Sequence, residues 1–156
     1  MTTLEQAFLS EAIELAHANV EKGGRPFGAV IVKDGSVIAS GVNEILHTND
    51  PTSHAELNAI RAASQKLHSA NLTGCTVYAS GHPCPMCLAA MRMSGIGEVV
   101  YAYSNEEGAP YGLSTAAIYA ELAKPFSQLS MKIRHQPVRP ESRTNLYMEW
   151  KRRQAL

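Results

Sequence analysis

The chain has 156 residues, and its 14 Lys and Arg residues balance 14 Asp and Glu residues, which gives a formal net charge of zero at pH 7. A chain of this length can bury a core as a single domain, here residues 1–156, without disulfides or metals to hold it together. Zero net charge argues against a protein that holds long nucleic acids through a strong positive field. It favours a small, nearly neutral substrate instead.

The N-terminal segment has charges scattered through it and no continuous apolar run, so it does not resemble a signal peptide. No segment approaches the roughly 20 apolar residues of a membrane span. We therefore expect a cytoplasmic protein without a membrane partner. Because thiols stay reduced in that compartment, we do not expect a disulfide framework from the three cysteines, Cys75, Cys84 and Cys87.

Helical and strand patterns alternate along the chain. Apolar residues recur at helical spacing from Leu4 to Leu15, and two apolar strands flank a turn at residues 33–35, which is a strong hairpin signal. Capping residues predict that a helix begins near residues 51–54. The remaining expected elements are a strand at 75–80, a helix at 84–95, a strand at 97–104, a helix at 114–124, an extended segment at 130–138 and a helix at 140–153. This order predicts an α/β fold with helices on both faces of one sheet.

Two of the expected helix starts carry potential metal ligands. His54 is expected in the first turn of one helix, and Cys84 and Cys87 in the first turn of the next. The positive end of the helix dipole favours thiolates at such a position, and the spacing of the two cysteines places them on one face. Two soft thiolates and one imidazole select zinc. Three protein ligands leave a fourth position open for water, as in catalytic zinc sites.

Glu56 follows His54 by two residues. Within a helix, residues two apart point about 200° away from each other and cannot serve one site. A metal that lies beyond the helix end can instead be ligated by His54 while Glu56 reaches a water on that metal. The rival interpretation is a non-catalytic zinc or redox module in which Cys84 and Cys87 form a dithiol, and it leaves the placing of Glu56 beside His54 unexplained.

The two motifs together match a known pattern. "HAE" at residues 54–56 and "PCPMC" at residues 83–87 fit the H-x-E and P-C-x-x-C signature of zinc nucleobase deaminases. The sequence therefore resembles the cytidine and deoxycytidylate deaminase superfamily. From its first helix to about Lys124 it is most similar to bacterial guanine deaminase and related nucleoside deaminases, through "GGRPFGAVIVKDG", "NDPTSHAE" and "PCPMCLAA".

This resemblance implies a three-layer α/β/α fold with a central mixed five-stranded sheet, and a homodimer. It also implies a hydrolase of purine metabolism that binds Zn²⁺ through His54, Cys84 and Cys87 and releases ammonia from a free nucleobase or nucleoside. Glu56 would act in turn as base and acid, moving protons between the water, the ring and the departing ammonia. The backbone N–H of Ala55 and the groups around Ser80 and Pro83 would hold the reacting edge of the ring.

The resemblance also suggests further substrate contacts. Asn43 would bind a purine or a ribose, although the residues alone also fit a turn residue at the end of a strand. Phe27 would form an apolar wall for the base, or be an ordinary core residue of the strand. His82 would line the pocket or lie in an exposed loop. The segment of about residues 125–156 would be exchanged between subunits, so that Trp150 or Tyr147 would close the partner's site.

One departure concerns the substrate. Where bacterial guanine deaminase carries an acidic pair, this chain has Ser114 and Thr115, and a hydroxyl cannot supply the charge-assisted hydrogen bonds of a carboxylate. Ser114 and the nearby Tyr111 would make different contacts. A guanine-like purine is the first expectation. The alternatives are adenosine in a tRNA loop, and cytosine or another aminated heterocycle. The basic "KRRQAL" end of the sequence favours the tRNA alternative.

Overall fold

The computed structural model describes residues 1–155, and the chain divides into two compact units. The N-terminal unit, Met1–Ala123, holds the sheet, its covering helices and every residue of the two sequence motifs. The C-terminal unit begins at Lys124. The expectation of a single domain over the whole chain stays a prediction.

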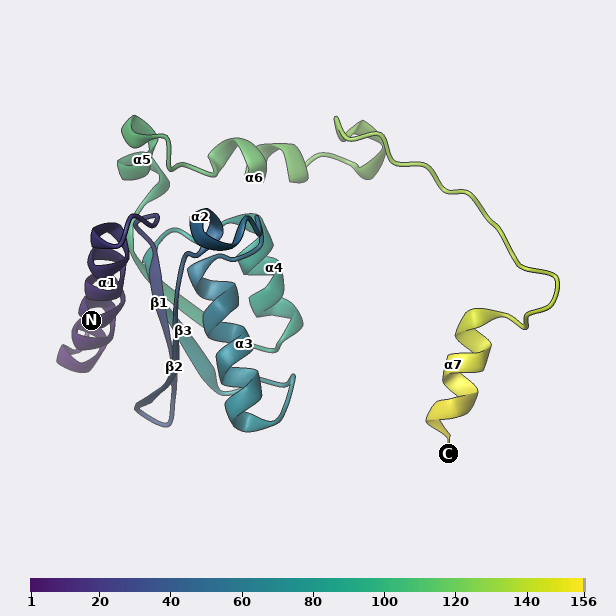
Figure 1. Ribbon diagram of the computed structural model, residues 1–156, viewed down its shortest axis with the longest axis horizontal. Helices are drawn as coiled ribbons and strands as arrows, with labels where there is room; N and C mark the ends of the chain where they lie inside the picture. The colour runs from purple at the N-terminus through teal and green to yellow at the C-terminus, as the bar shows by residue number, and fades with distance from the viewer. Residues whose placement is uncertain (156) are drawn as a thin grey trace. The chain divides into compact units, whose positions relative to one another are not determined.

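The sheet of the N-terminal unit has four strands in the order β2-β1-β3-β4 (Figure 1). They are β1 (Gly28–Lys33), β2 (Ser36–Val42), β3 (Cys75–Gly81) and β4 (Glu98–Tyr103). The first two form the expected hairpin, whose turn has positive φ at both Asp34 (50°) and Gly35 (77°), as a type I′ turn requires. β1 is antiparallel to both β2 and β3, and β3 is parallel to β4, so the sheet is mixed.

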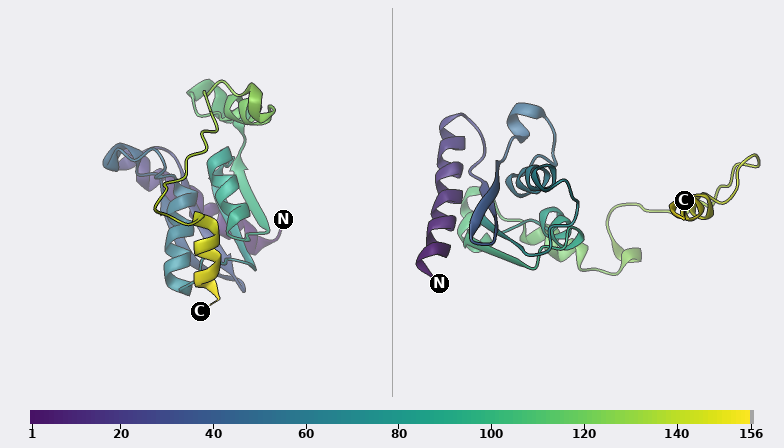
Figure 2. Two further views of the ribbon diagram at one scale, coloured as in Figure 1. Left: turned by 90° about the vertical axis from the view of Figure 1, so that its right-hand side faces the viewer. Right: turned by 90° about the horizontal axis from the view of Figure 1, so that it is seen from below.

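Helices cover both faces of this sheet, as expected. Figure 2 shows α1 (Thr3–Glu21) on one side of it and α3 (Ala55–Leu67) with α4 (Pro85–Met93) on the other. Phe8 and Leu9 of α1 pack against Val30 and Tyr78 on the first face. The second face holds the larger apolar core, formed with small and aliphatic residues of α3 and α4. The result is the three-layer α/β/α arrangement.

The close packing of α3 on β2 depends on Gly41. A Cβ atom at this position would lie 2.4 Å from the carbonyl oxygen of Ala55, which leaves no room for any side chain. The first turn of α3 can therefore lie directly against the sheet, and Ala55 is fully buried there. This contact fixes the position of the helix start that carries His54 and Glu56.

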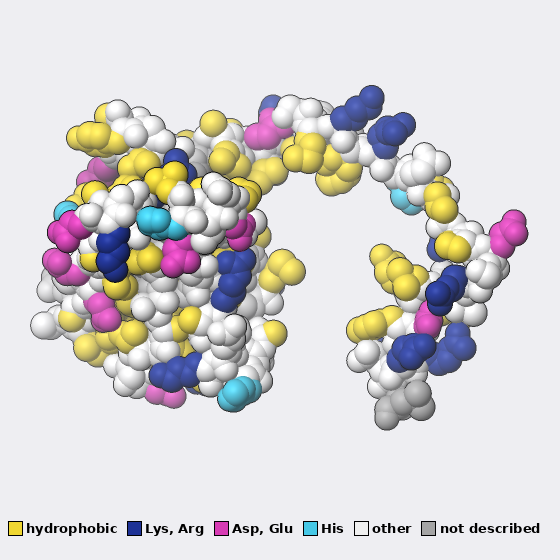
Figure 3. Space-filling view, viewed as in Figure 1, with side chains coloured by type: hydrophobic (Ala, Val, Ile, Leu, Met, Phe, Trp, Pro, Cys, Tyr) yellow, Lys and Arg dark blue, Asp and Glu magenta, His cyan; other side chains and the backbone are white. Residues whose placement is uncertain are grey.

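Five short elements complete the first unit and the start of the second. They are α2 (Ile45–Thr48), α5 (Asn105–Gly108), η1 (Ala109–Tyr111), α6 (Ala116–Leu122) and η2 (Phe126–Gln128). In the C-terminal unit, α7 (Leu146–Gln154) begins where the Asn145 side chain accepts hydrogen bonds from the backbone N–H groups of Tyr147 (3.0 Å) and Met148 (3.2 Å). Figure 3 shows apolar side chains along one side of this helix and Lys and Arg side chains along another.

Within residues 1–155, no helix combines the length and the apolar character that crossing a lipid bilayer demands.

Two sequence expectations need correction. The sheet has four strands rather than five, because residues 130–138 form no strand and β4 stays at the edge of the sheet. The apolar residues of that segment alternate with Lys and Arg, but an extended segment becomes a strand only when another strand takes up its backbone hydrogen bonds. The last helix begins at Leu146 rather than at Pro140, because the Asn145 cap defines its first turn.

Candidate active site

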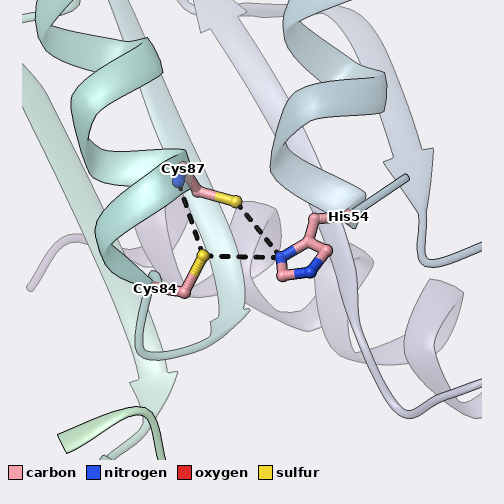
Figure 4. Close-up of side chains that lie close together, drawn as sticks. All are labelled: His54, Cys84 and Cys87. Atoms are coloured by element: carbon pink, nitrogen blue, oxygen red, sulfur yellow. Dashed lines mark hydrogen bonds between the residues drawn. The ribbon is translucent and has the colours of Figure 1, made fainter. Parts of the chain in front are cut away.

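Three potential metal ligands meet where α3 and α4 begin. The Nδ1 atom of His54 lies 3.5 Å from the Sγ atom of Cys84 and 3.5 Å from that of Cys87. Figure 4 shows the three side chains pointing toward one another, the cysteines from the start of α4 and the histidine from the start of α3. We call His54, Cys84 and Cys87 the metal cluster, since their donor atoms all lie within 4.8 Å of one another.

Helix capping explains why these residues converge. His54 is the N-cap of α3 and Cys84 the N-cap of α4, and both have extended backbone angles. They therefore stand one residue before the first turns in which we expected them. Pro85 follows as the first residue of α4, a position that suits its fixed φ and missing N–H. The Sγ atom of Cys84 accepts a hydrogen bond of 3.4 Å from the backbone N–H of Cys87, so the cap itself orients the thiolate.

The cluster shifts the titration of its own members. The pKa of Cys84 is lowered to about 4, first because the Cys87 side chain hydrogen-bonds to it and then because of His54 and the Cys87 backbone N–H. The pKa of Cys87 is raised, because its thiol donates to Cys84 and is buried. The pKa of His54 is raised, chiefly by its hydrogen bond with Cys84. A metal cation can bind such a thiolate and imidazole by displacing the protons that these side chains carry.

The spacing of the donor atoms fits zinc. With zinc–sulfur bonds near 2.3 Å and zinc–nitrogen bonds near 2.05 Å, a tetrahedral site separates sulfur from nitrogen by about 3.6 Å. The two separations here are both 3.5 Å. Two thiolates and one imidazole are a soft donor set that suits Zn²⁺. Three protein ligands leave a fourth position for water or substrate, which is typical of a catalytic site rather than a structural one.

Glu56 lies in the first turn of α3 with 7% of its surface exposed. Burial raises the pKa of this carboxyl group above its usual range. The capping geometry also explains how His54 and Glu56, two residues apart, can serve one site. His54 has extended backbone angles and lies outside the helix, so the helical rotation of about 100° per residue does not turn it away from Glu56. The two side chains line one cavity of ≈ 270 Å³.

Three of the expected substrate contacts line the same cavity. Phe27, Asn43 and Ser114 line it together with Glu56 and the metal cluster residues His54 and Cys84. Its remaining lining residues are Arg25, His82, Gly112, Leu113, Thr115 and Ile118. Besides the starts of α3 and α4, three other distant segments contribute to it: the loop before β1, the end of β2, and α6 with the loop before it.

The other expected contacts have different positions. Ala55 is fully buried. Because it is the first residue of α3, its backbone N–H is one of the donors that have no acceptor within the helix. Pro83 is buried, and its carbonyl oxygen accepts a hydrogen bond from the hydroxyl of Tyr119. The hydroxyl of Ser80 accepts a hydrogen bond from the backbone N–H of Gly28 (3.0 Å). Trp150 lies in α7 of the C-terminal unit with 60% of its surface exposed.

A second and larger cavity of ≈ 650 Å³ lies beside the first in the N-terminal unit. Phe27, His82 and Leu113 line both, whereas Tyr111 lines only the larger one. Neither Glu56 nor any member of the metal cluster lines the larger cavity, so we place the chemistry in the smaller one despite its size. His82 forms the wall between them and packs edge-on against Tyr101, with ring centroids 4.7 Å apart.

Sequence reasoning missed two residues near the cavity. Arg25 lines it, and the two glycines before it gave only a helix-end signal. Asn105 links its walls: its Nδ2 atom lies 3.3 Å from Nδ1 of His82, and its Oδ1 atom accepts a hydrogen bond from the backbone N–H of Thr115 (3.1 Å). No short motif marks such a residue, because its partners are separated along the chain.

Comparisons with known proteins agree with this geometry. The family model of the cytidine and deoxycytidylate deaminase zinc-binding region matches residues 2–103. Guanine deaminase of Bacillus subtilis (strain 168) is 46% identical over 124 residues, which are 79% of this chain and 80% of that protein. The crystal structure of the guanine deaminase from Bacillus subtilis superposes with a TM-score of 0.77 and 38% identity, covering 99% of this chain and 93% of that one.

Two further relatives are more distant. The tRNA-specific adenosine deaminase of Aquifex aeolicus (strain VF5) is 39% identical over 98 residues, which are 63% of this chain and 65% of that protein. A protein solved in complex with 2,6-diaminopurine matches with a TM-score of 0.69 and 29% identity, over 74% of this chain and 64% of that one. With a metal cluster whose spacing fits zinc and a family model that matches most of its length, the chain belongs to the cytidine and deoxycytidylate deaminase family and is a zinc-dependent aminohydrolase.

Proposed function

We propose that the chain catalyses the hydrolytic deamination of a free guanine-like purine. The observation that supports this proposal most directly is that the buried Glu56 and the metal cluster residues His54 and Cys84 line one cavity of ≈ 270 Å³. A cavity of this size suits a single heterocyclic base. In the reaction, water replaces the exocyclic amino group, and the products are the oxo-purine and ammonia.

The division of labour follows from the donor types. Zn²⁺, when bound by the metal cluster, supplies Lewis-acid chemistry that lowers the pKa of water toward neutrality. Glu56 takes the proton from the attacking water and gives it to the ring nitrogen beside the reacting carbon. It then transfers the second proton to the amino group, which leaves as ammonia. Burial of Glu56, which raises its pKa, suits a carboxyl group that must hold a proton between these steps.

The other expected residues bind and orient the base. Phe27 offers an apolar wall, Asn43 a side-chain amide and Ser114 a hydroxyl, all on the lining of the same cavity. The backbone N–H of Ala55 and the groups around Ser80 and Pro83 lie near the two helix starts and hold the reacting edge of the ring. The positions of these groups beside Glu56 and Cys84 in the chain support this assignment.

A free guanine-like base is favoured over the two alternatives. The guanine deaminase from Bacillus subtilis matches more of the chain, and with higher identity, than the tRNA-specific adenosine deaminase from Aquifex aeolicus. A tRNA substrate also requires a positive surface, whereas the net charge of this chain is zero. The structure with bound 2,6-diaminopurine supports a purine over cytosine.

We also propose a cytoplasmic homodimer that exchanges its segment of about residues 125–156. Leu146, Tyr147 and Trp150 of α7 are 60–81% exposed, and such an apolar surface is suited to another protein surface. In the exchanged dimer Trp150 closes the partner's cavity. A reducing compartment keeps Cys84 and Cys87 available as thiolate ligands, and both are free cysteines.

The experiment is a substrate panel with the zinc-loaded protein. Ammonia release is measured with guanine, guanosine, cytosine, cytidine, adenine, adenosine and a tRNA anticodon stem-loop, and the Glu56→Gln variant provides the blank. We expect turnover of guanine well above that of the other substrates. Activity on the stem-loop alone, with none on the free bases, would falsify the proposal.

A further inference from the structure

One charged side chain of the active-site cavity has no part in the chemistry described so far. Arg25 lies in the loop between α1 and β1 and lines the cavity together with His54, Glu56 and Asn43. A fixed cation at this place is available to a substrate.

The guanidinium group of Arg25 is not bound by the protein. Among residues 1–155 it takes part in no ion pair and no side-chain hydrogen bond. Arg25 is exposed, so its N–H donors meet solvent in the free protein and are available to a ligand in the cavity.

The backbone of Arg25, in contrast, is held in place. Its carbonyl oxygen accepts hydrogen bonds from the Nδ2 atom of Asn19 (2.8 Å) and from the backbone N–H of Phe27 (2.8 Å). The same Nδ2 atom of the buried Asn19 also donates to the carbonyl oxygen of Asn43 (2.8 Å). At Gly24 a Cβ atom would lie 2.5 Å from that Nδ2 atom, so only glycine permits this approach. Asn19 thereby ties the loop that carries Arg25 to the strand end that carries Asn43.

The polar groups around Arg25 are also donors. The Oδ1 atom of Asn43 accepts from the backbone N–H of Ile45 (3.1 Å), which leaves its Nδ2 donors for the cavity. The Oγ atom of Ser114 accepts from the backbone N–H of Ala116 (3.1 Å), which leaves its hydroxyl proton free to donate. Among the lining residues the structure describes, Glu56 is the one carboxylate. We call Arg25, Asn43 and Ser114 the recognition group, and together they match a ligand edge that carries acceptors.

Guanine has such an edge. Its O6 and N7 atoms are neighbouring acceptors, and arginine binds this pair through two parallel N–H donors. Adenine and 2,6-diaminopurine carry an amino group at C6, whose hydrogens would face the hydrogens of the guanidinium group. The amine that the enzyme removes from guanine stands at C2, so the O6 and N7 edge remains free for recognition while the C2 side reacts.

We propose that Arg25 is a specificity-determining residue that binds the O6 and N7 edge of the substrate and selects 6-oxopurines over purines without the oxygen. The inference rests on the proposed function and names its substrate class. Arg25 is the one Lys or Arg side chain among the described residues that line this cavity.

The test compares two substrates that share the reacting amine. Guanine and 2-aminopurine both carry an amino group at C2, but 2-aminopurine lacks O6. For the zinc-loaded Arg25→Met variant we expect kcat/KM with guanine to fall by about 5- to 150-fold, and that with 2-aminopurine to change by about threefold or less. Because each variant is compared with wild type on the same base, the different intrinsic reactivities of the two bases cancel.

Two further variants sharpen this test. Arg25→Lys keeps the charge but not the two parallel donors, so it should recover only a small part of the guanine activity. Lys22→Met removes a positive charge from the same loop, where Lys22 is exposed and does not line the cavity, and it should leave both substrates unchanged. Zinc content is measured for every variant.

The possible results separate the inference from the proposed function. A selective loss with guanine supports Arg25 as the determinant. Equal losses with both bases, or no loss with guanine, overturn the inference while wild-type turnover leaves the proposed function intact. Wild-type protein that releases ammonia from neither base overturns the proposed function, and the assignment of Arg25 with it.

Discussion

The metal cluster and the recognition group serve one cavity, but the chain builds them from different kinds of segment. The metal cluster comes from two helix starts, where capping fixes each side chain within a few residues of sequence. The recognition group comes from three separate loops that tertiary contacts such as those of Asn19 bring together. With the roles proposed above, the type of reaction is encoded locally, whereas the choice of substrate depends on the packing of distant segments.

The comparison has a direct consequence for substitutions. A change in the metal cluster or at Glu56 should reduce activity on every substrate by the same factor. A change in the recognition group should alter the preference among substrates and leave the metal in place.

The largest effect is expected for Cys84→Ala. Removing one of three ligands should lower zinc content from about one ion per chain to a small fraction of that and abolish turnover of all bases. Zinc is measured by elemental analysis after dialysis. Cys75→Ala is the matched control, because Cys75 is a buried cysteine of β3 outside the metal cluster, and it should keep its zinc. Full zinc occupancy in Cys84→Ala would remove this residue from the site.

The next effect is expected for Glu56→Gln. This variant retains all three metal ligands but cannot move protons, so kcat should fall by about 10²- to 10⁴-fold on guanine and 2-aminopurine alike. Steady-state kinetics and zinc content are measured on the same preparation. A kcat close to that of wild type, at equal zinc content, would contradict the assigned role of Glu56.

A smaller effect is expected for Asn43→Ala. Loss of the side-chain amide removes one hydrogen bond to the base, so kcat/KM should fall by about 10-fold, mostly through KM, with zinc unchanged. Asn71→Ala is the matched control, because Asn71 also accepts from a backbone N–H two residues ahead (3.0 Å) but lies in an exposed turn outside the cavity. If both variants lost the same activity, the effect of Asn43 would come from its turn rather than from substrate binding.

The smallest effect is expected for Ser114→Ala. A single half-buried hydroxyl contributes one neutral hydrogen bond, so kcat/KM with guanine should fall by about threefold. The decrease is read from competition between guanine and 2-aminopurine in one mixture. A loss greater than that of Asn43→Ala would reverse the order of importance within the recognition group.

The sequence predicted correctly that the three residues of the metal cluster come together. His54, Cys84 and Cys87 were expected together because two short spacings and a soft donor set leave few other uses for them. Their capping geometry was not foreseen in detail: His54 and Cys84 precede their helices, and this position removes the apparent conflict with Glu56. The hairpin turn at Asp34 and Gly35 was equally local and equally well predicted.

The parts that the sequence did not predict depend on distant partners. Arg25 resembles an ordinary loop residue until Asn19 and Asn43 are seen beside it. The expected fifth strand had an alternating pattern at residues 130–138, but a pattern cannot supply the neighbouring strand that would accept its hydrogen bonds. The role of Trp150 and the exchange of the last segment stay predictions, because they concern a second copy of the chain.

The most direct test of the central claim identifies the product of guanine in water enriched in ¹⁸O. The zinc-loaded protein is incubated with guanine, and the purine product is analysed by mass spectrometry. Hydrolysis at C2 predicts xanthine that carries one ¹⁸O atom, formed together with ammonia and absent with Glu56→Gln. Recovery of unchanged guanine would contradict guanine as the substrate, and a product without the label would contradict attack by water activated at the metal cluster.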